Sequence, residues 1–216
     1  MISSSKSTNG CTLKPPGRCE VRIGERPLVD LIVMNKSLEH GDHKALLVID
    51  MQVGIVADAW NLDQVVVNIT RMIGEMRGQG VPIVWVRHSD EDLEAGSDAW
   101  QIIPTLIPSG SEPVVEKHHG DAFEDTALEL VLDHLGISHV VICGAETDAC
   151  VLSTLFGAFV RGYDVTLVSD AHTTADRTAC GVPPPKDVVA LINRVWAHRI
   201  APGRRATVIA SDNVWT

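Results

Sequence analysis

Three residues of the sequence, Asp50, Lys117 and Cys150, carry the groups that covalent hydrolysis of a carbonyl compound needs. Each follows a short apolar run of the kind that forms a buried strand. Because the carboxyl ends of parallel strands lie along one edge of an open sheet, where ligands bind, we expect an acid, a cation and a thiol to meet there. A carboxylate can accept the proton of a thiol, and the resulting thiolate attacks a carbonyl carbon. The three residues therefore predict acyl transfer to a cysteine.

The segment 139–162 places the thiol of Cys150. Its apolar run ends at Gly144 and predicts a strand, and from Thr147 onward apolar residues recur with the period of a helix. Thr147 is the expected N-cap, so Cys150 falls in the first helical turn, where unpaired amide hydrogens and the helix dipole favour a thiolate. Most free cysteines are buried small hydrophobes, which is our interpretation of Cys143, and position alone does not exclude it for Cys150.

Strands and helices alternate along the chain. The expected strands cover residues 45–49, 82–87, 113–116, 139–143, 163–168 and 206–210. The expected helices cover residues 63–77, 121–135, 147–161 and 185–196, and the second of them begins with the capping-box pair Asp121 and Glu124. This alternation predicts an α/β fold, a doubly wound, Rossmann-like, six-stranded parallel sheet with helices on both faces. The long polar loop 88–111 is expected to line or cover a site.

Composition narrows the setting and the partners. The 216 residues, 45% hydrophobic and 21% charged, predict a polar, loosely ordered tail over residues 1–40 and one globular domain over residues 41–216. The formal net charge of -10 argues against nucleic acid and anionic membranes as partners. No apolar run reaches the length of a membrane span, and the N-terminus lacks the apolar core of a secretory signal. Five cysteines without a framework spacing predict free thiols in the cytoplasm.

Motifs for nucleotides and metals are weak. Neither a G-x-G-x-x-G nor a G-x-x-x-x-G-K-[ST] loop follows a strand, so no cofactor is expected. His118 and the pair His88 and Asp90 stand near strand ends, where ligands could sit, but no tight Cys/His or H-E-x-x-H spacing is present. We therefore predict no metal. A redox dithiol of Cys143 and Cys150 is a further alternative, which a strand-buried Cys143 disfavours.

Three motifs, in this order, resemble the isochorismatase-like cysteine hydrolases: ALLVIDMQ at 45–52, PVVEKHHGDAFEDTALE at 113–129 and GAETDACVLSTLFGAFVRGYDVTLVSDA at 144–171. The resemblance spans roughly residues 44–200. It implies a catalytic triad of Asp50, Lys117 and Cys150, a six-stranded parallel sheet, and assembly into a homo-oligomer, either a dimer or a tetramer.

Two differences from members of that family narrow the implied activity. Members that cleave the vinyl ether of isochorismate lack the cysteine, so Cys150 implies the branch that hydrolyses C–N bonds. Nicotinamidases of the family carry an Asp-x-His metal motif after the second strand, where residues 88–92 read His-Ser-Asp-Glu-Asp. The resemblance thus favours a hydrolase of a small amide, carbamoyl or ureido compound. A nicotinamidase-type, metal-assisted amidase and a catalytically silent binding protein on the same fold stay open.

The expected mechanism uses Asp50 as general base and acid, Lys117 as electrostatic support, and a thioester on Cys150. The oxyanion is expected against the backbone amides of Glu146 and Cys150. The resemblance also implies a cis peptide bond between Ala145 and Glu146, which would aim the first of these amides. The expected substrate-binding residues are Gln52, Trp60, His88, Trp100, His118 and Phe156.

Overall fold

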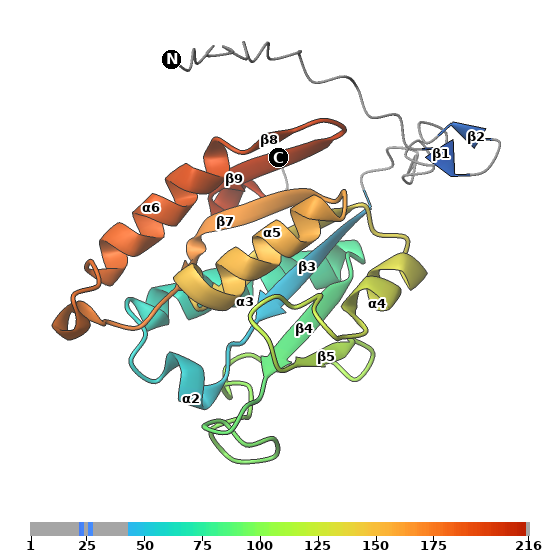
Figure 1. Cartoon of the computed structure of the whole chain (residues 1–216). Coiled ribbons are helices and arrows are strands. Elements are labelled where there is room, and N and C mark those ends of the chain that lie inside the picture. Colours follow the sequence, from blue (N-terminus) through green and yellow to red (C-terminus); the bar gives the residue numbers. More distant parts are fainter. Residues whose placement is uncertain (1–21, 24–25, 28–42, 215–216) are drawn as a thin grey trace, which may run out of the picture. The chain divides into compact units, whose positions relative to one another are not determined.

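The computed structural model describes residues 22–23, 26–27 and 43–214, and the chain divides into two units, 1–37 and 38–216 (Figure 1). In the first unit, β1 (Arg22–Ile23) and β2 (Arg26–Pro27) form an antiparallel pair. The rest of the predicted tail lies outside the described residues, so its predicted looseness stays a prediction.

The second unit is built on a seven-stranded sheet with the strand order β5-β4-β3-β6-β7-β9-β8. Six of its strands are parallel: β3 (Lys44–Ile49), β4 (Ile83–His88), β5 (Val114–Lys117), β6 (His139–Ala145), β7 (Asp164–Thr173) and β9 (Arg204–Ile209). These six confirm the predicted parallel sheet. The seventh, β8 (Ile200–Ala201), is antiparallel to β9 at the edge and is too short to have a recognisable period.

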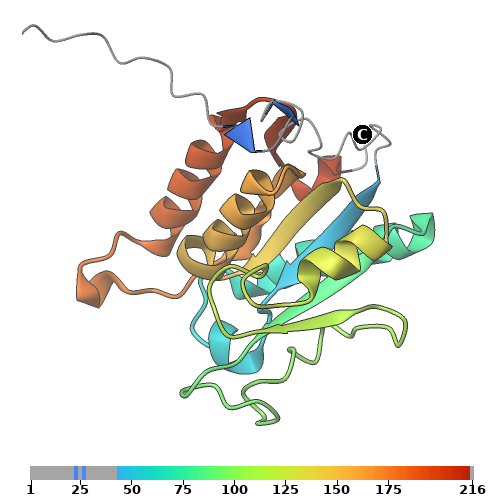
Figure 2. The same ribbon diagram turned by 45° about the vertical axis from the view of Figure 1, so that its right-hand side comes forward.

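Helices cover both faces of the sheet, as predicted. The helices α4 (Leu128–His134), α5 (Leu152–Val160) and α6 (Pro185–Ala197) pack into the core on one face, and α2 (Val53–Val56) and α3 (Leu62–Gln79) into the core on the other. Figures 1 and 2 show α4 and α5 on the near side of the sheet and α3 behind it. Within the described ranges, no helix is long and apolar enough to cross a membrane.

The central strand β3 explains why the sequence signal was strong there. Ala45, Leu47 and Ile49 belong to the core on one face, and Leu46 and Val48 belong to the core on the other. A strand that is buried on both faces has to be apolar at every position, so it reads as a continuous run.

Gly144 is where β6 passes close to β3. Its φ of 118° lies in the region that favours glycine, and a Cβ at this position would overlap the backbone of Ile49. The glycine therefore lets the end of β6 lie against the end of β3, directly before the segment that carries Cys150.

The helix predicted from residue 121 begins only at Leu128, so the capping-box prediction was wrong. The Asp121 carboxylate accepts the N–H of Phe123, two residues on, which closes a turn instead of opening a helix. It also forms an ion pair with Arg161, the C-cap residue of α5. The helix is preceded by Thr126, whose hydroxyl accepts the N–H of Leu128.

The helix that carries Cys150 also begins differently from the prediction. Its first turn, Thr147–Val151, is a π-helical turn that continues into α5, and the N-cap residue is Glu146. Thr147 does not cap the helix with its side chain, because its buried hydroxyl lies 2.9 Å from Nδ1 of His172 on β7. Cys150 nevertheless lies in the first turn, as predicted.

Candidate active site

Asp50 and Lys117 meet at the carboxyl edge of the sheet, although the strand β4 lies between the strands β3 and β5 from which they come. Asp50 follows β3 directly and adopts a φ of 48°, a left-handed conformation that aspartate tolerates better than most residues. Lys117 ends β5, and its side chain reaches past the end of β4 to place Nζ 2.7 Å from Oδ2 of Asp50. Both side chains are fully buried. The pair is therefore a buried ion pair.

Cys150 completes the cluster from the other side. Lys117 Nζ donates a hydrogen bond to Cys150 Sγ, 3.2 Å away, and further ones to the backbone carbonyl of His119 at 3.1 Å and to Nδ1 of His88 at 3.2 Å. The acid, the cation and the thiol thus come together as the sequence predicted. Their catalytic roles belong to the proposal below.

The electrostatics of the cluster favour a protonated thiol at rest. The pKa of Cys150 is raised to about 12, first by burial and then by the negative charge of Asp50, while Lys117 lowers it. This differs from the expectation that the helix terminus would favour a thiolate, because burial and a neighbouring carboxylate outweigh the charge of Lys117. A base is therefore needed to generate the nucleophile.

Asp50 is suited to be that base. Burial raises its pKa above the ordinary value, and the charge of Lys117 is the largest influence in the opposite direction. Hydrogen bonds from Lys117 and from the thiol of Cys150 also lower the pKa of Asp50, and they use only part of the four lone pairs of the carboxylate. The carboxylate therefore has the affinity and the free lone pairs to receive a proton from the thiol.

The peptide bond between Ala145 and Glu146 is cis, which confirms the expectation drawn from the family resemblance. It lies between β6 and the π-helical turn, so that Glu146 and Cys150 belong to the same short segment. The carbonyl of Glu146 accepts the N–H groups of Ala149 and Val151, at 3.2 and 3.0 Å. The use of the Glu146 and Cys150 amides as an oxyanion hole stays a prediction.

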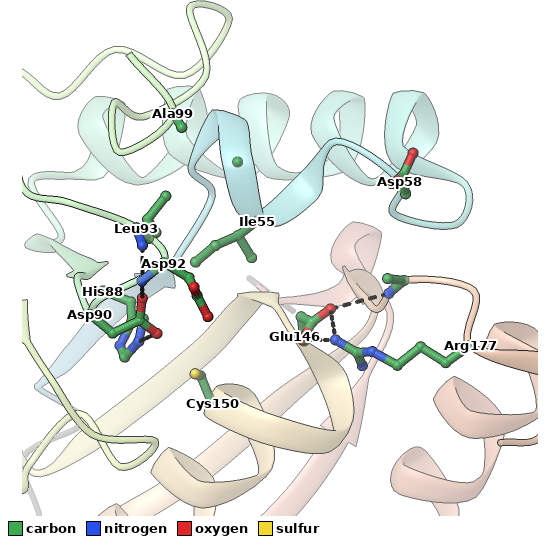
Figure 3. A pocket seen from close by; sticks show the side chains of 12 residues that line it. Ile55, Asp58, His88, Asp90, Asp92, Leu93, Ala99, Glu146, Cys150 and Arg177 are labelled. Atoms are coloured by element: carbon green, nitrogen blue, oxygen red, sulfur yellow. Dashed lines mark hydrogen bonds and ion pairs between the residues drawn. The ribbon is translucent and has the colours of Figure 1, made fainter. Parts of the chain in front are cut away.

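A pocket of about 470 Å³ opens beside the sulfur of Cys150. It is lined by Gly54, Ile55, Asp58, His88, Asp90, Asp92, Leu93, Ala99, Glu146, Cys150, Ala175 and Arg177 (Figure 3). Four of these side chains are carboxylates and one is a guanidinium. Nη2 of Arg177 lies 2.7 and 2.6 Å from the two carboxylate oxygens of Glu146, so the pocket wall contains one closed ion pair and an excess of negative charge.

Of the six residues predicted to bind substrate, His88 lies in the pocket wall. Gln52 is buried behind it and holds the backbone: its amide oxygen accepts the N–H of His88, and its amide nitrogen donates to the carbonyls of His88 and Trp100. The imidazole of His118 lies 3.2 Å from the Ser89 hydroxyl. Gln52, Trp100 and His118 thus surround the site without lining the pocket.

The remaining two predicted residues lie away from the pocket. Trp60 lines a separate cavity of about 430 Å³ beside Asp170 and His172. Phe156 is partly buried and packs against the core, where its ring lies 5.7 Å from that of Trp196 in an edge-on contact. Both residues were predicted to line the pocket because they are aromatic. The direction of each side chain depends instead on how α5 and the loop after α2 pack.

Sequence reasoning missed several side chains of the pocket. Ile55 comes from the short helix α2, Asp92 from the loop after β4, and Arg177 from the loop after β7. Glu146 was identified only for its backbone amide. The loop residues carry no periodic signal, and only the length of the polar loop 88–111 indicated that part of it would reach a site.

The pair His88 and Asp90 is engaged within the protein. Nδ1 of His88 receives the hydrogen bond from Lys117, and Nε2 lies 3.0 Å from Oδ2 of Asp90. Across the residues described by the structure, no group of three or more His, Cys, Asp or Glu side chains is arranged to hold a metal ion.

Comparison with known proteins adds the family. The model of the isochorismatase domain matches residues 44–181. A streptothricin hydrolase of Streptomyces noursei is 34% identical over 143 residues, which cover 62% of this chain and 55% of the relative. A ureidoacrylate amidohydrolase (RutB) of an Enterobacter species is 25% identical over 171 residues, which cover 60% of this chain and 74% of the relative. The chain thus spans little more than half the length of the streptothricin hydrolase that it matches.

Solved structures agree with this fold. A putative isochorismatase hydrolase from Oleispira antarctica superimposes with a TM-score of 0.71 at 28% identity, over 80% of this chain and 96% of that one. A cysteine hydrolase from Pseudomonas syringae has a TM-score of 0.72 at 20% identity, over 80% and 90% of the two chains, and shows the shared fold alone.

Proposed function

The chain belongs to the isochorismatase family, and from that premise we propose that it is a cysteine-dependent hydrolase that cleaves a C–N bond of a small amide, carbamoyl or ureido compound. One observation carries the proposal. The Nζ atom of Lys117 lies 2.7 Å from a carboxylate oxygen of Asp50 and 3.2 Å from the sulfur of Cys150, and that sulfur faces a pocket. A buried base, a fixed cation and an accessible thiol are the parts that acyl transfer needs.

In the first step, Asp50 takes the proton of the Cys150 thiol while sulfur attacks the carbonyl carbon. Proton transfer moves the negative charge from the carboxylate to the sulfur, and Lys117 remains beside both atoms, so the cluster keeps the same net charge. Because the pKa of Asp50 is raised, it differs less from the pKa of the Cys150 thiol, and the free energy needed for this proton transfer is smaller.

The tetrahedral intermediate places its oxyanion against the backbone N–H groups of Glu146 and Cys150. Loss of one such donor typically slows an enzyme by about a hundredfold or more. As the C–N bond breaks, the leaving nitrogen takes the proton from Asp50, and the acyl group stays on Cys150 as a thioester. A water molecule that gives its proton to Asp50 then attacks the thioester, the C–S bond breaks to release the acid, and Asp50 returns the proton to the sulfur of Cys150.

Two relatives support a C–N bond as the target. The matched proteins are named as a streptothricin hydrolase and a ureidoacrylate amidohydrolase. Cys150 also stands where the proposed mechanism needs a covalent nucleophile. We further propose that the enzyme acts in the cytoplasm, which its five cysteines without a framework spacing favour, and as a homo-oligomer, which the family resemblance favours.

A panel of small amides, carbamoyl acids and ureido acids, assayed for release of ammonia or amine, tests the function. The panel should span cationic, neutral and anionic compounds, because the pocket wall carries four carboxylates and one guanidinium. Intact-mass spectrometry follows the acyl adduct, and Cys180→Ser is the matched control because that thiol is exposed and lies outside the pocket wall.

Turnover that Cys150→Ala abolishes and Cys180→Ser retains, with an adduct on the peptide containing Cys150, is the expected result. Turnover that survives Cys150→Ala would contradict the covalent mechanism. A panel without any turnover or adduct would contradict the proposed substrate class.

A further inference from the structure

His88 stands between the proposed catalytic cluster and the pocket. It is the register partner of Lys117 in the parallel pair of β4 and β5, so the lysine side chain must pass the imidazole to reach Asp50. Nδ1 of His88 lies 3.2 Å from Nζ of Lys117, and Nε2 lies 3.0 Å from Oδ2 of Asp90. His88 is mostly buried, and Asp90 is about half exposed.

The ammonium group of Lys117 has fewer N–H donors than there are hydrogen-bond acceptors around it. An ammonium has three N–H donors. Three acceptors lie in hydrogen-bonding geometry: the carbonyl of His119, Nδ1 of His88 and Sγ of Cys150. Asp50 is the nearest neighbour at 2.7 Å and is charged, so it competes with these three acceptors for the same hydrogens. The hydrogen that His88 accepts is therefore kept from Asp50.

His88 can accept that hydrogen in one protonation state only. Nδ1 must carry a lone pair, so the ring must be neutral with its proton on Nε2. Asp90 favours this tautomer because its Oδ2 lies where the Nε2–H points, and its Oδ1 is held in turn by the N–H groups of Asp92 and Leu93. Gln52 fixes the backbone of His88 on both sides.

We propose that His88, held in this tautomer by Asp90, is a positioning residue that accepts one N–H of Lys117 and so keeps that hydrogen from Asp50. The inference rests on the proposed function, in which Cys150 is the nucleophile and Asp50 its base. It assigns to His88 a task that neither the triad nor the pocket requires.

Removal of the acceptor has a defined consequence. Without Nδ1, the hydrogen of Lys117 that His88 held turns to Asp50, which is the nearest and the only charged acceptor beside it in the described cluster. Asp50 then becomes a weaker base. A weaker base lowers the population of thiolate, so Cys150 reacts more slowly with an electrophile.

The test is the rate at which iodoacetamide alkylates Cys150, followed by mass spectrometry of its peptide between about pH 7 and pH 9, where the rate follows the thiolate population. His88→Leu removes the acceptor, and His88→Asn keeps an oxygen acceptor near the place of Nδ1. The exposed thiol of Cys180 is alkylated in the same sample and serves as the internal reference. Far-UV circular dichroism checks that each variant is folded.

We expect alkylation of Cys150 to be about tenfold slower in His88→Leu and within about twofold of the parent protein in His88→Asn, as for loss and retention of one hydrogen bond to a charged group. Asp90→Ala should slow it by a smaller factor, since the ring can then adopt the other tautomer. The remaining charged groups around the thiol are unchanged in every variant: Asp50, Asp58, Asp92, Lys117, Glu146 and Arg177.

The proposal would be overturned if Cys150 were alkylated at an unchanged or faster rate in folded His88→Leu. It would also be overturned if His88→Asn slowed the alkylation of Cys150 as much as His88→Leu does. Alkylation needs no substrate, so its outcome is separate from the search for a hydrolysed amide. If the panel assay finds turnover and the alkylation rates do not differ, the proposed function stands and the role of His88 falls.

Discussion

Replacement of Lys117 by methionine tests how the buried ion pair is held in the fold. Lys117 and Asp50 have no exposed side-chain surface and lie 2.7 Å apart. Methionine keeps an unbranched apolar chain and removes the charge. Because burial raises the pKa of Asp50 and the charge of Lys117 is the largest influence that lowers it, the pKa of Asp50 should rise further in Lys117→Met.

The sign of the resulting pH dependence follows from proton binding. The unfolded chain loses the Asp50 proton near its ordinary pKa of about 3.9, whereas the folded variant keeps it up to a much higher pH. Between these two values the folded state binds one proton more, so stability falls by about 1.4 kcal/mol for each unit of rising pH. From pH 5 to pH 7 the variant should lose up to about 2.7 kcal/mol relative to the parent protein.

Urea unfolding at pH 5, 6 and 7 measures this difference. The matched control is the double variant Asp50→Asn with Lys117→Met, which lacks the titrating carboxylate. Its free energy of unfolding should not show the additional fall with pH that is expected for Lys117→Met. His172 titrates in the same window, because burial lowers its pKa to about 4 and it therefore adds stability as pH rises. His172 is present in every variant, so its contribution cancels when the free energies of unfolding of the variants are compared.

Parallel pH profiles for the single and the double variant would refute the reasoning. That result would mean that water or a structural change relieves the burial of Asp50 once the lysine is gone, and that Lys117 is not the group that allows this carboxylate to be charged inside the protein.

Three further predictions concern catalysis and the backbone. Cys150→Ala should leave the melting temperature nearly unchanged and lower turnover by at least about a thousandfold, and Asp50→Asn should be nearly as damaging; kinetics on the first substrate found checks both. Treatment with a chelator should leave turnover unchanged, whereas a loss that zinc or iron restores would place a metal at the pair His88 and Asp90. Gly144→Ala should destabilise the protein by about 3 kcal/mol or more, seen as a lower melting temperature, because its Cβ would overlap the neighbouring strand. A melting temperature equal to that of the parent protein would contradict that packing.

Much of the fold followed from sequence pattern because the sheet is buried on both faces. Strands such as Lys44–Ile49 and His139–Ala145 are apolar at nearly every position, and glycines or polar residues bound them. The rule that carboxyl ends of parallel strands share one edge then predicted that Asp50, Lys117 and Cys150 lie close together.

Tertiary structure decided what surrounds these three residues. The sequence predicted a thiolate from the position of Cys150 on its own helix, whereas its pKa is raised by burial and by a carboxylate that lies about a hundred residues away in the chain. Thr147 has the right type for a cap, yet its hydroxyl meets His172 on another strand.

The pocket walls depended on tertiary structure most of all. Phe156 has the residue type of a pocket wall but faces the core, whereas Arg177 and Asp92 reach the pocket from loops without any periodic pattern. Periodicity records which side of a strand or helix is apolar, because burial repeats with the geometry of the element. The direction of a loop side chain and the electrostatic potential at a buried thiol depend instead on segments that are distant in the sequence. Both become defined only when the chain has folded.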